Sequence, residues 1–205
     1  MNYNTLASKE TLKKTQEGLE NKGYEVFVVD NKSQALEKIK TLIPEAASVM
    51  NGSSVTLEQI GYQDYLKSGI HEWNDLHAKV NAENDKVKRA KLRKESALSD
   101  YYLGSVHALT ETGEFVIASN TGSQLPHIVF TSPNLIFVVS TKKIVPTLDE
   151  AMKRLTKHVI PLEDKHMLKL YNIHTGLNKI VTFRGETKYM GRKIRFILVK
   201  EDLGF

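Results

Sequence analysis

The run NLIFVVS at residues 134–140 restricts the fold of this chain more than any other segment. A strand with one face in water alternates apolar and polar residues, and this run does not alternate. It is also far too short for a membrane helix, which needs about 20 apolar residues. A continuous apolar run of this length is typical of a strand buried on both faces, as in parallel sheets covered by helices. The run therefore predicts an α/β fold.

The residues before this run alternate between helix and strand patterns. The expected elements are a helix over residues 5–21, a strand over 24–29, a helix that begins at Asn31 or Ser33 and ends before Pro44, a strand over 47–50 and a short helix with Leu57 and Ile60. Residues 62–80 are ambiguous. This rhythm predicts a Rossmann-like, mostly parallel sheet with helices on both faces. We expect a single domain over residues 1–205, with an N-terminal helix within residues 1–22.

The second half adds a hairpin and more helices. Two β-rich arms surround Thr112-Gly113 within residues 101–119, which predicts an inserted β-hairpin. A capping box over residues 147–150 predicts the start of a helix, because its threonine and glutamate can satisfy free N–H groups. The remaining expected elements are a helix over residues 161–172 and strands over 179–183 and 194–199.

The charge of the chain gathers in one segment. The formal net charge is +5, and the stretch KVKRAKLRK at residues 86–94 supplies much of it. We expect residues 81–98 to form a charged surface helix, with nucleic-acid binding as the alternative. No aromatic residue interleaves the basic run, so it offers nothing for bases to stack on.

Absent residue types exclude several kinds of site. The sequence has no cysteine, which excludes disulfides, thiolate metal sites, Fe–S ligation and cysteine nucleophiles within this chain. Neither a His-Glu-x-x-His zinc motif nor a Gly-x-Ser-x-Gly elbow is present, and we expect no metal site. The first residues, MNYNTLASKE, lack an apolar signal segment, so we expect a cytoplasmic protein without a membrane span.

Three segments together carry a resemblance to a known family. They are residues 99–116, with the core Ala-Leu-Thr-Glu-Thr-Gly, residues 127–130 (HIVF) and residues 143–151 (KIVPTLDEA). In these segments the chain resembles the LUD (lactate-utilisation) domain family, and within it the small cysteine-free type. Members of this type often carry a Gly-Pro-Ser-x-Thr-Ala-Asp stretch. The corresponding residues 183–192 depart from it, since only Gly185 and Thr187 match.

The resemblance implies a fold, a metabolic context and partners. The implied fold is similar to the superfamily of ribose-5-phosphate isomerase, glucosamine-6-phosphate deaminase and CoA-transferase, with a site at the strand ends. The implied context is the oxidation of lactate or another organic acid. Expected partners are a small anionic metabolite, an Fe–S oxidoreductase subunit and further copies of the chain. No cofactor is evident in this chain, so an Fe–S cluster enters only through the partner subunit.

Glu111 is the candidate catalytic residue. A carboxylate at a hairpin tip can act as base, acid or nucleophile when burial raises its pKa, and the resemblance implies this role because related CoA-transferases use a glutamate in a Glu-x-Gly turn. In the alternative, Glu111 and Gly113 are turn residues without chemistry. His107 precedes Glu111 by four residues and shares its face in an alternating strand, so we expect the two near each other.

The candidate ligand-binding residues follow expected strands. Loops of this kind offer N–H groups to an anion where they open onto a helix, and ligands collect at the carboxyl ends of parallel strands. The candidates are Asn51, Gly52, Ser53, Ser54, Gly113, Thr121, Gly122, Ser123 and Lys143. Two alternatives remain open: the serines cap a helix, and Lys142 and Lys143 are a solvated pair.

Three functions are compatible with these residues, and whether the chain is an enzyme stays open. The first is an accessory or small-anion-binding component of lactate or organic-acid metabolism. The second is a divergent enzyme of the CoA-transferase and sugar-phosphate isomerase superfamily that uses Glu111. The third, which we rank last, is a basic nucleic-acid-binding protein.

Overall fold

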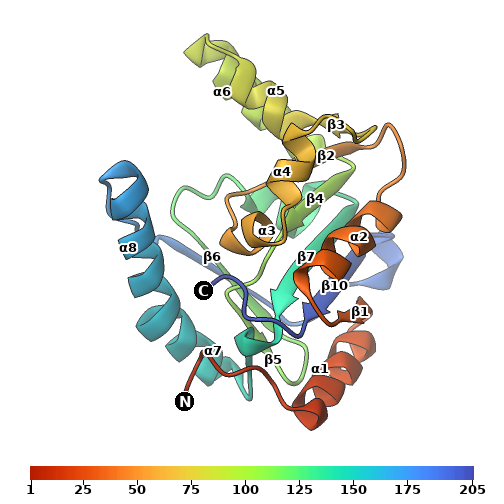
Figure 1. The fold of residues 1–205 in the computed structure, drawn as a ribbon, viewed down its shortest axis with the longest axis vertical. Helices are drawn as coiled ribbons and strands as arrows, with labels where there is room; N and C mark the ends of the chain where they lie inside the picture. The colour runs from red at the N-terminus through yellow and green to blue at the C-terminus, as the bar shows by residue number, and fades with distance from the viewer.

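Two stacked sheets form the centre of the molecule (Figure 1). The structure is a computed structural model that describes residues 1–205 apart from the side chain of Lys188. The helices are α1 (Lys9–Asn21), α2 (Lys32–Leu42), α3 (Val55–Gln59), α4 (Tyr62–Lys67), α5 (Leu76–Ala82), α6 (Lys86–Glu95), α7 (Leu148–Arg154) and α8 (Ile160–Tyr171). The strands are β1 (Glu25–Val29), β2 (Ser48–Asn51), β3 (Asn74–Asp75), β4 (Tyr101–Gly104), β5 (Ala108–Thr110), β6 (Phe115–Ser119), β7 (Asn134–Ser140), β8 (Ile144–Val145), β9 (Lys179–Phe183) and β10 (Lys193–Val199).

The main sheet is parallel throughout, with strand order β1-β10-β7-β4-β2-β3. In its centre Phe196 of β10 pairs with Phe137 of β7. Successive residues of β7 enter different cores: Phe137 joins one cluster of buried side chains, and Ile136 and Val138 join another. The apolar run at residues 134–140 is therefore a strand buried on both faces, and the α/β, Rossmann-like fold class is confirmed.

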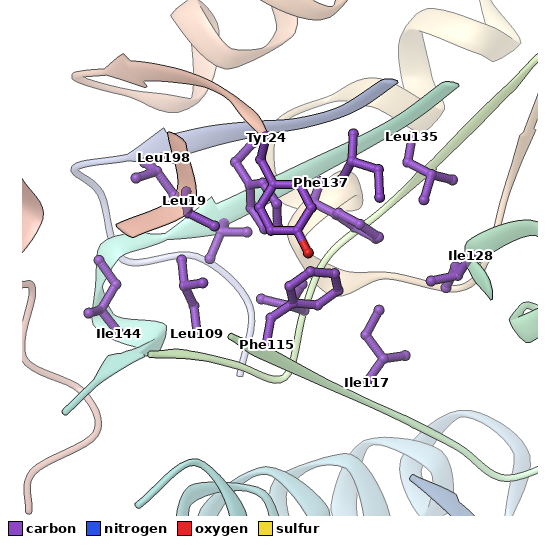
Figure 2. Close-up of a cluster of buried hydrophobic side chains, with 14 of the residues drawn as sticks. Leu19, Tyr24, Leu109, Phe115, Ile117, Ile128, Leu135, Phe137, Ile144 and Leu198 are labelled. Atoms are coloured by element: carbon purple, nitrogen blue, oxygen red, sulfur yellow. The ribbon is translucent and has the colours of Figure 1, made fainter. Parts of the chain in front are cut away.

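The first core fills the space between the two sheets. The second sheet has the order β8-β5-β6-β9 and turns Phe115 and Ile117 of β6 toward the main sheet. Figure 2 shows Tyr24, Phe115 and Phe137 at the centre of this core, and the Phe115 and Phe137 ring centroids lie 5.4 Å apart. Because side chains of a strand alternate, Val116 of β6 points to the opposite side.

Helices cover both outer faces. Ala35 and Ile39 of α2 and Leu57 of α3 pack on the far side of the main sheet. Ala151 of α7 and Leu155 pack on the outer face of the second sheet, against Val116. The layers of the molecule are therefore helices, main sheet, second sheet and helices. Helices lie on both outer sides of the pair of sheets.

The hairpin region differs from the expectation for residues 101–119. Only β5 and β6 form the antiparallel hairpin, with Ala108 paired to Val116. The preceding β4 is a separate strand of the main sheet, between β7 and β2. The chain leaves the main sheet after Gly104 and enters the second sheet at Ala108. No turn sequence lies between these residues to indicate the change of sheet.

The N-terminal helix begins later than residue 5. Ser8 is its N-cap, and the Ser8 Oγ accepts a hydrogen bond from the Thr11 N–H at 3.1 Å. This cap fixes the start of α1 at Lys9, since it satisfies an N–H group that the helix leaves free. Leu6 lies outside the helix and is 38% exposed.

The two helices expected after residue 147 form one continuous run. The segment Leu155–Val159 is a wider π-helical turn that joins α7 directly to α8. Pro161 lies inside this run, not before it. Because proline has no N–H to donate and its ring clashes with the preceding turn, a widened turn at this point relieves the conflict.

The charged segment expected as one surface helix over residues 81–98 is divided, since α5 ends at Ala82 and α6 begins at Lys86, and most of it is exposed. In Figure 1, α5 and α6 project away from the sheets. None of the residues of α6 is buried, and Val87 is 80% exposed, so α6 has no buried apolar face. Among the residues that the structure describes, no helix has both the length and the apolar character needed to cross a membrane.

Candidate functional site

A cavity of about 370 Å³ opens at the carboxyl edge of the main sheet. Its walls come from the loop after β2, the residues after β4, the loop after β6, the residue Lys143 beyond β7, and α8. In Figure 1 the C-terminus lies between α3 and α8, and Phe205 lines the same cavity. Ligands of parallel α/β sheets bind at this edge, where the loops that follow the strands converge.

Lys143, which follows β7, is a buried basic residue that lines the cavity. Its side chain is buried, with 4% exposed. The Nζ lies 3.0 Å from the Thr56 Oγ1, 3.1 Å from the Ser105 Oγ and 3.4 Å from the Val106 carbonyl oxygen. Among the described residues, no Asp or Glu carboxylate lies within ion-pairing distance of this Nζ. A solvated surface lysine is therefore the wrong description of Lys143.

Neighbouring cations create a positive potential around Lys143. Burial holds the pKa of the Lys143 ammonium well below its usual value, and the positive charges of Arg154 and Lys142 lower it further. Arg154 is buried and donates from its Nη1 to the His107 carbonyl oxygen, while its Nε and Nη2 have no partner in the described part of the chain. Lys142 differs, because it forms an ion pair with Asp202.

His107 lines the cavity as a neutral group. Its Nδ1 accepts a hydrogen bond from the Ala118 N–H at 3.1 Å, which ties the start of β5 to β6. Burial lowers the pKa of the His107 imidazole to about 3, and the charges of Lys143 and Arg154 act in the same direction. At neutral pH the ring is uncharged, and the Nδ1 contact requires the proton to be on Nε2.

Glu163 of α8 carries the only carboxyl side chain among the residues that line the cavity. Partial burial raises the pKa of this carboxyl group, with His166 acting weakly in the opposite direction. A carboxyl group in a cavity can act as a general acid or base. The cavity thus combines a buried lysine with a group able to transfer protons.

The two polar loops meet at this cavity, as their positions after strands predict. Gly52, Ser53, Ser54, Thr121 and Ser123 line it. The Ser54 side chain also caps α3, where it accepts a hydrogen bond from the Leu57 N–H at 3.3 Å. Asn51 and Gly122 are not among the lining residues.

A second, polar cavity of about 230 Å³ adjoins the first. Gly52 and Tyr102 belong to the walls of both. A Cβ on Gly52 would lie 2.6 Å from the Tyr102 Oη, so this position has no space for a side chain. The Asn51 Oδ1 is buried beside the second cavity and has no hydrogen-bond partner in the described part of the chain.

The C-terminal residues close the first cavity. Gly204 lies against Lys143, and a Cβ on it would come within 2.2 Å of the Thr56 Oγ1 and 2.8 Å of the Lys143 Nζ. Its backbone also has a φ of +65°, which favours glycine. Nothing in the sequence indicates that this tail, or Glu163, belongs to the site.

Glu111 and Gly113 lie apart from both cavities. The Glu111 Oε2 forms an ion pair with the Lys14 Nζ at 2.7 Å, and Gly113 packs against Gly18 of α1. His107 lines the cavity whereas Glu111 does not, so the two do not share a site as expected. The hairpin spans the distance between them, with His107 at its cavity end and Glu111 at its turn.

The residues that the structure describes contain no group of three or more His, Cys, Asp or Glu side chains placed to hold a metal ion.

Comparisons with known proteins give a family from the sequence and a similar fold from a solved structure. A family model described as LUD domain matches residues 12–197. The crystal structure of a DUF162 family protein from Deinococcus radiodurans is similar in fold, with a TM-score of 0.56 and 13% sequence identity. That match covers 95% of this chain and 99% of the other. None of the curated proteins matches the sequence.

Proposed function

This chain belongs to the LUD domain family, and on that premise we propose that it binds a small organic acid in the cavity around Lys143. The family takes its name from lactate utilisation, and the chain is a relative of lactate-utilisation proteins. The observation that carries the proposal is the buried Lys143 side chain, which has no carboxylate partner among the described residues and lies near the positive charges of Arg154 and Lys142.

The electrostatics of the cavity favour an anion. A buried charge is costly unless an opposite charge accompanies it. Lys143 has hydroxyl and carbonyl oxygens around it, and Arg154 lies close enough to lower its pKa. The carboxylate of a bound acid would offset the positive potential that Arg154 and Lys142 create beside Lys143.

The loops support the same ligand class. Gly52, Ser53 and Ser54 line the cavity directly before α3. The hydroxyl groups of Ser53, Thr121 and Ser123 add hydrogen-bond partners for a carboxylate or a hydroxyl group. A volume of about 370 Å³ suits a small metabolite, because such sites span roughly 300–1,000 Å³.

Titration calorimetry with lactate, pyruvate and inorganic phosphate tests the proposal. We expect at least one of these anions to bind, and Lys143→Met to weaken its binding at least about tenfold, equivalent to about 1.4 kcal/mol. Lys157→Met is the matched control, because Lys157 is exposed and does not line the cavity. Binding that is unchanged in a folded Lys143→Met protein, or no binding of any of the three anions, would contradict the proposal.

A further inference from the structure

We propose that Lys143 forms an imine with its ligand, so that the ligand is a carbonyl compound that carries an anionic group, such as a 2-oxo acid. This inference rests on the proposed function and names the ligand class of the same cavity. It stands on the position of the Lys143 Nζ in the cavity wall and on the groups that surround it.

The contacts of Nζ suit a neutral amine. The Val106 carbonyl oxygen is the one partner that can only accept a hydrogen bond. The hydroxyl groups of Thr56 and Ser105 can accept from an N–H or donate to the nitrogen lone pair. A neutral amine can therefore satisfy all its hydrogen bonds here. A carboxylate, the usual partner of a lysine, would instead favour the charged ammonium.

The adjacent residue provides a contrast. Lys142 has a carboxylate partner in Asp202, which stabilises its charged form. Lys143 has no such partner among the described residues, and the nearby charges of Lys142 and Arg154 oppose a further positive charge. Amines of this kind are the nucleophiles of Schiff-base chemistry, because only the unprotonated nitrogen attacks a carbonyl carbon.

The reaction needs no oxidant, reductant or cofactor. The amine nitrogen bonds to the carbonyl carbon, and the carbonyl oxygen takes a proton to give a carbinolamine. The hydroxyl group then leaves as water together with the remaining N–H proton, and a carbon–nitrogen double bond forms. Both protons of that water come from the neutral amine. Glu163 lines the same cavity, and its carboxyl group, whose pKa burial raises, can relay these protons.

The cavity also explains why the carbonyl compound is an anion. The imine nitrogen takes the place of the Lys143 amine, near the positive charges of Arg154 and Lys142. The positive potential of these two residues favours a ligand with a negatively charged group next to its carbonyl carbon. A carboxylate and a phosphate both meet this requirement. The experiment therefore uses one compound of each kind.

Reductive trapping tests the inference. The protein is incubated with pyruvate or with dihydroxyacetone phosphate in the presence of cyanoborohydride, which reduces an imine to a stable secondary amine. Intact-mass spectrometry measures the addition, and peptide mapping locates it. We expect one addition, at Lys143, from at least one of the two compounds, and none at the exposed Lys157 under the same conditions.

The mapping uses the unaltered protein, so it does not depend on how well a variant folds. Thr56→Val keeps Lys143 but removes one hydroxyl partner, and we expect it to slow trapping severalfold. An anion that binds by calorimetry without any trapped adduct overturns the imine and leaves the anion site intact. Additions spread over exposed lysines, or an unmodified Lys143 beside a modified Lys157, also overturn it. Absence of any binding overturns both proposals.

Discussion

At the scale of single residues, Lys142 and Lys143 are adjacent in sequence but have different environments. Lys142 pairs with Asp202 from the C-terminal tail, and Lys143 lies in the cavity beside Thr56. The sequence shows only that two lysines follow a buried strand. Which lysine receives a carboxylate depends on a tail about 60 residues away, so no local pattern could distinguish them.

Glu114 provides a prediction at this scale. Burial on its own raises the pKa of its carboxyl group, but hydrogen bonds from Thr112, Lys22 and Thr110 outweigh burial and lower that pKa from 4.5 to about 2. A lowered folded-state pKa contributes stability that is complete above the unfolded pKa and is lost as pH falls toward the folded pKa. We expect the stability difference between wild type and Glu114→Gln to shrink between pH 5 and pH 2.

Urea denaturation at several pH values measures this difference. Glu17→Gln is the control, because Glu17 is an exposed residue of α1 whose pair with Lys13 lies at 3.9 Å. The difference in unfolding free energy between wild type and Glu114→Gln is expected to depend on pH. If it stays constant down to pH 2, the hairpin hydrogen bonds do not favour the charged carboxylate.

At the scale of elements, α1 and the β5–β6 hairpin pack backbone against backbone. A Cβ on Gly18 would lie 2.7 Å from the Glu111 carbonyl oxygen, and one on Gly113 would lie 2.6 Å from the Gly18 carbonyl oxygen. Both positions need glycine for this close approach. The Glu-Thr-Gly segment, which is central to the family resemblance, therefore forms a docking contact for α1 in this chain.

Glu111→Gln tests the hairpin glutamate. Its ion pair with Lys14 is partly exposed, and such pairs contribute roughly 0–1 kcal/mol. We expect the substitution to lower stability by no more than about 1 kcal/mol and to leave anion binding unchanged. Calorimetry alongside Lys143→Met provides the comparison. A loss of binding in Glu111→Gln similar to that in Lys143→Met would instead support the enzyme that uses Glu111.

Elements with a strong local signal could be predicted from the sequence, and others could not. The strand at residues 134–140 and the capped helix after Thr147 have patterns that only one structure satisfies. The short β4 could not be separated from the hairpin, because Tyr101–Gly104 reads as part of a longer β-rich stretch. The π-helical turn before Pro161 was missed, since proline usually marks a helix start.

Arg192 shows how a residue outside the family pattern can still have a structural role. Its guanidinium group donates to the carbonyl oxygens of Ile128 and Val129, each at 2.9 Å, and to the Glu186 carboxylate at 3.0 Å. These bonds join the loop before β10 to the turn at residues 127–131. The sequence gives no hint of the partners, because they are backbone atoms about 60 residues away.

At the scale of the whole molecule, stability is concentrated in the middle of the main sheet. β7 and β10 are almost fully buried, whereas α6 has no buried residue. We expect amides of residues 134–140 and 194–199 to exchange with deuterium slowest and those of residues 86–95 fastest, because exchange follows local opening. Hydrogen-exchange mass spectrometry checks this order. Protection of residues 86–95 equal to that of β7 would mean that α6 has a packing partner.

The whole-molecule arrangement also explains how much of the site the sequence could predict. The loops at residues 52–54 and 121–123 both reach the first cavity, because they follow strands whose carboxyl ends lie near the same edge, and their role in ligand binding stays a prediction. Glu163 and Gly204 were missed, since they enter the cavity from a helix and a tail that carry no binding motif. The paired role expected for His107 and Glu111 was wrong, because the hairpin holds them at opposite ends.

The place of β10 between β1 and β7 has a consequence for synthesis on the ribosome. β1 pairs with β10, which is translated after every other strand. At about 5–20 residues per second, β1 emerges roughly 10 to 30 seconds before its partner. During that interval the nascent chain exposes the unpaired edges of β1 and β7, the kind of surface that chaperones hold. Gly204 and Phe205 follow β10 and line the first cavity, so the walls of that cavity are complete only after β10 has been translated.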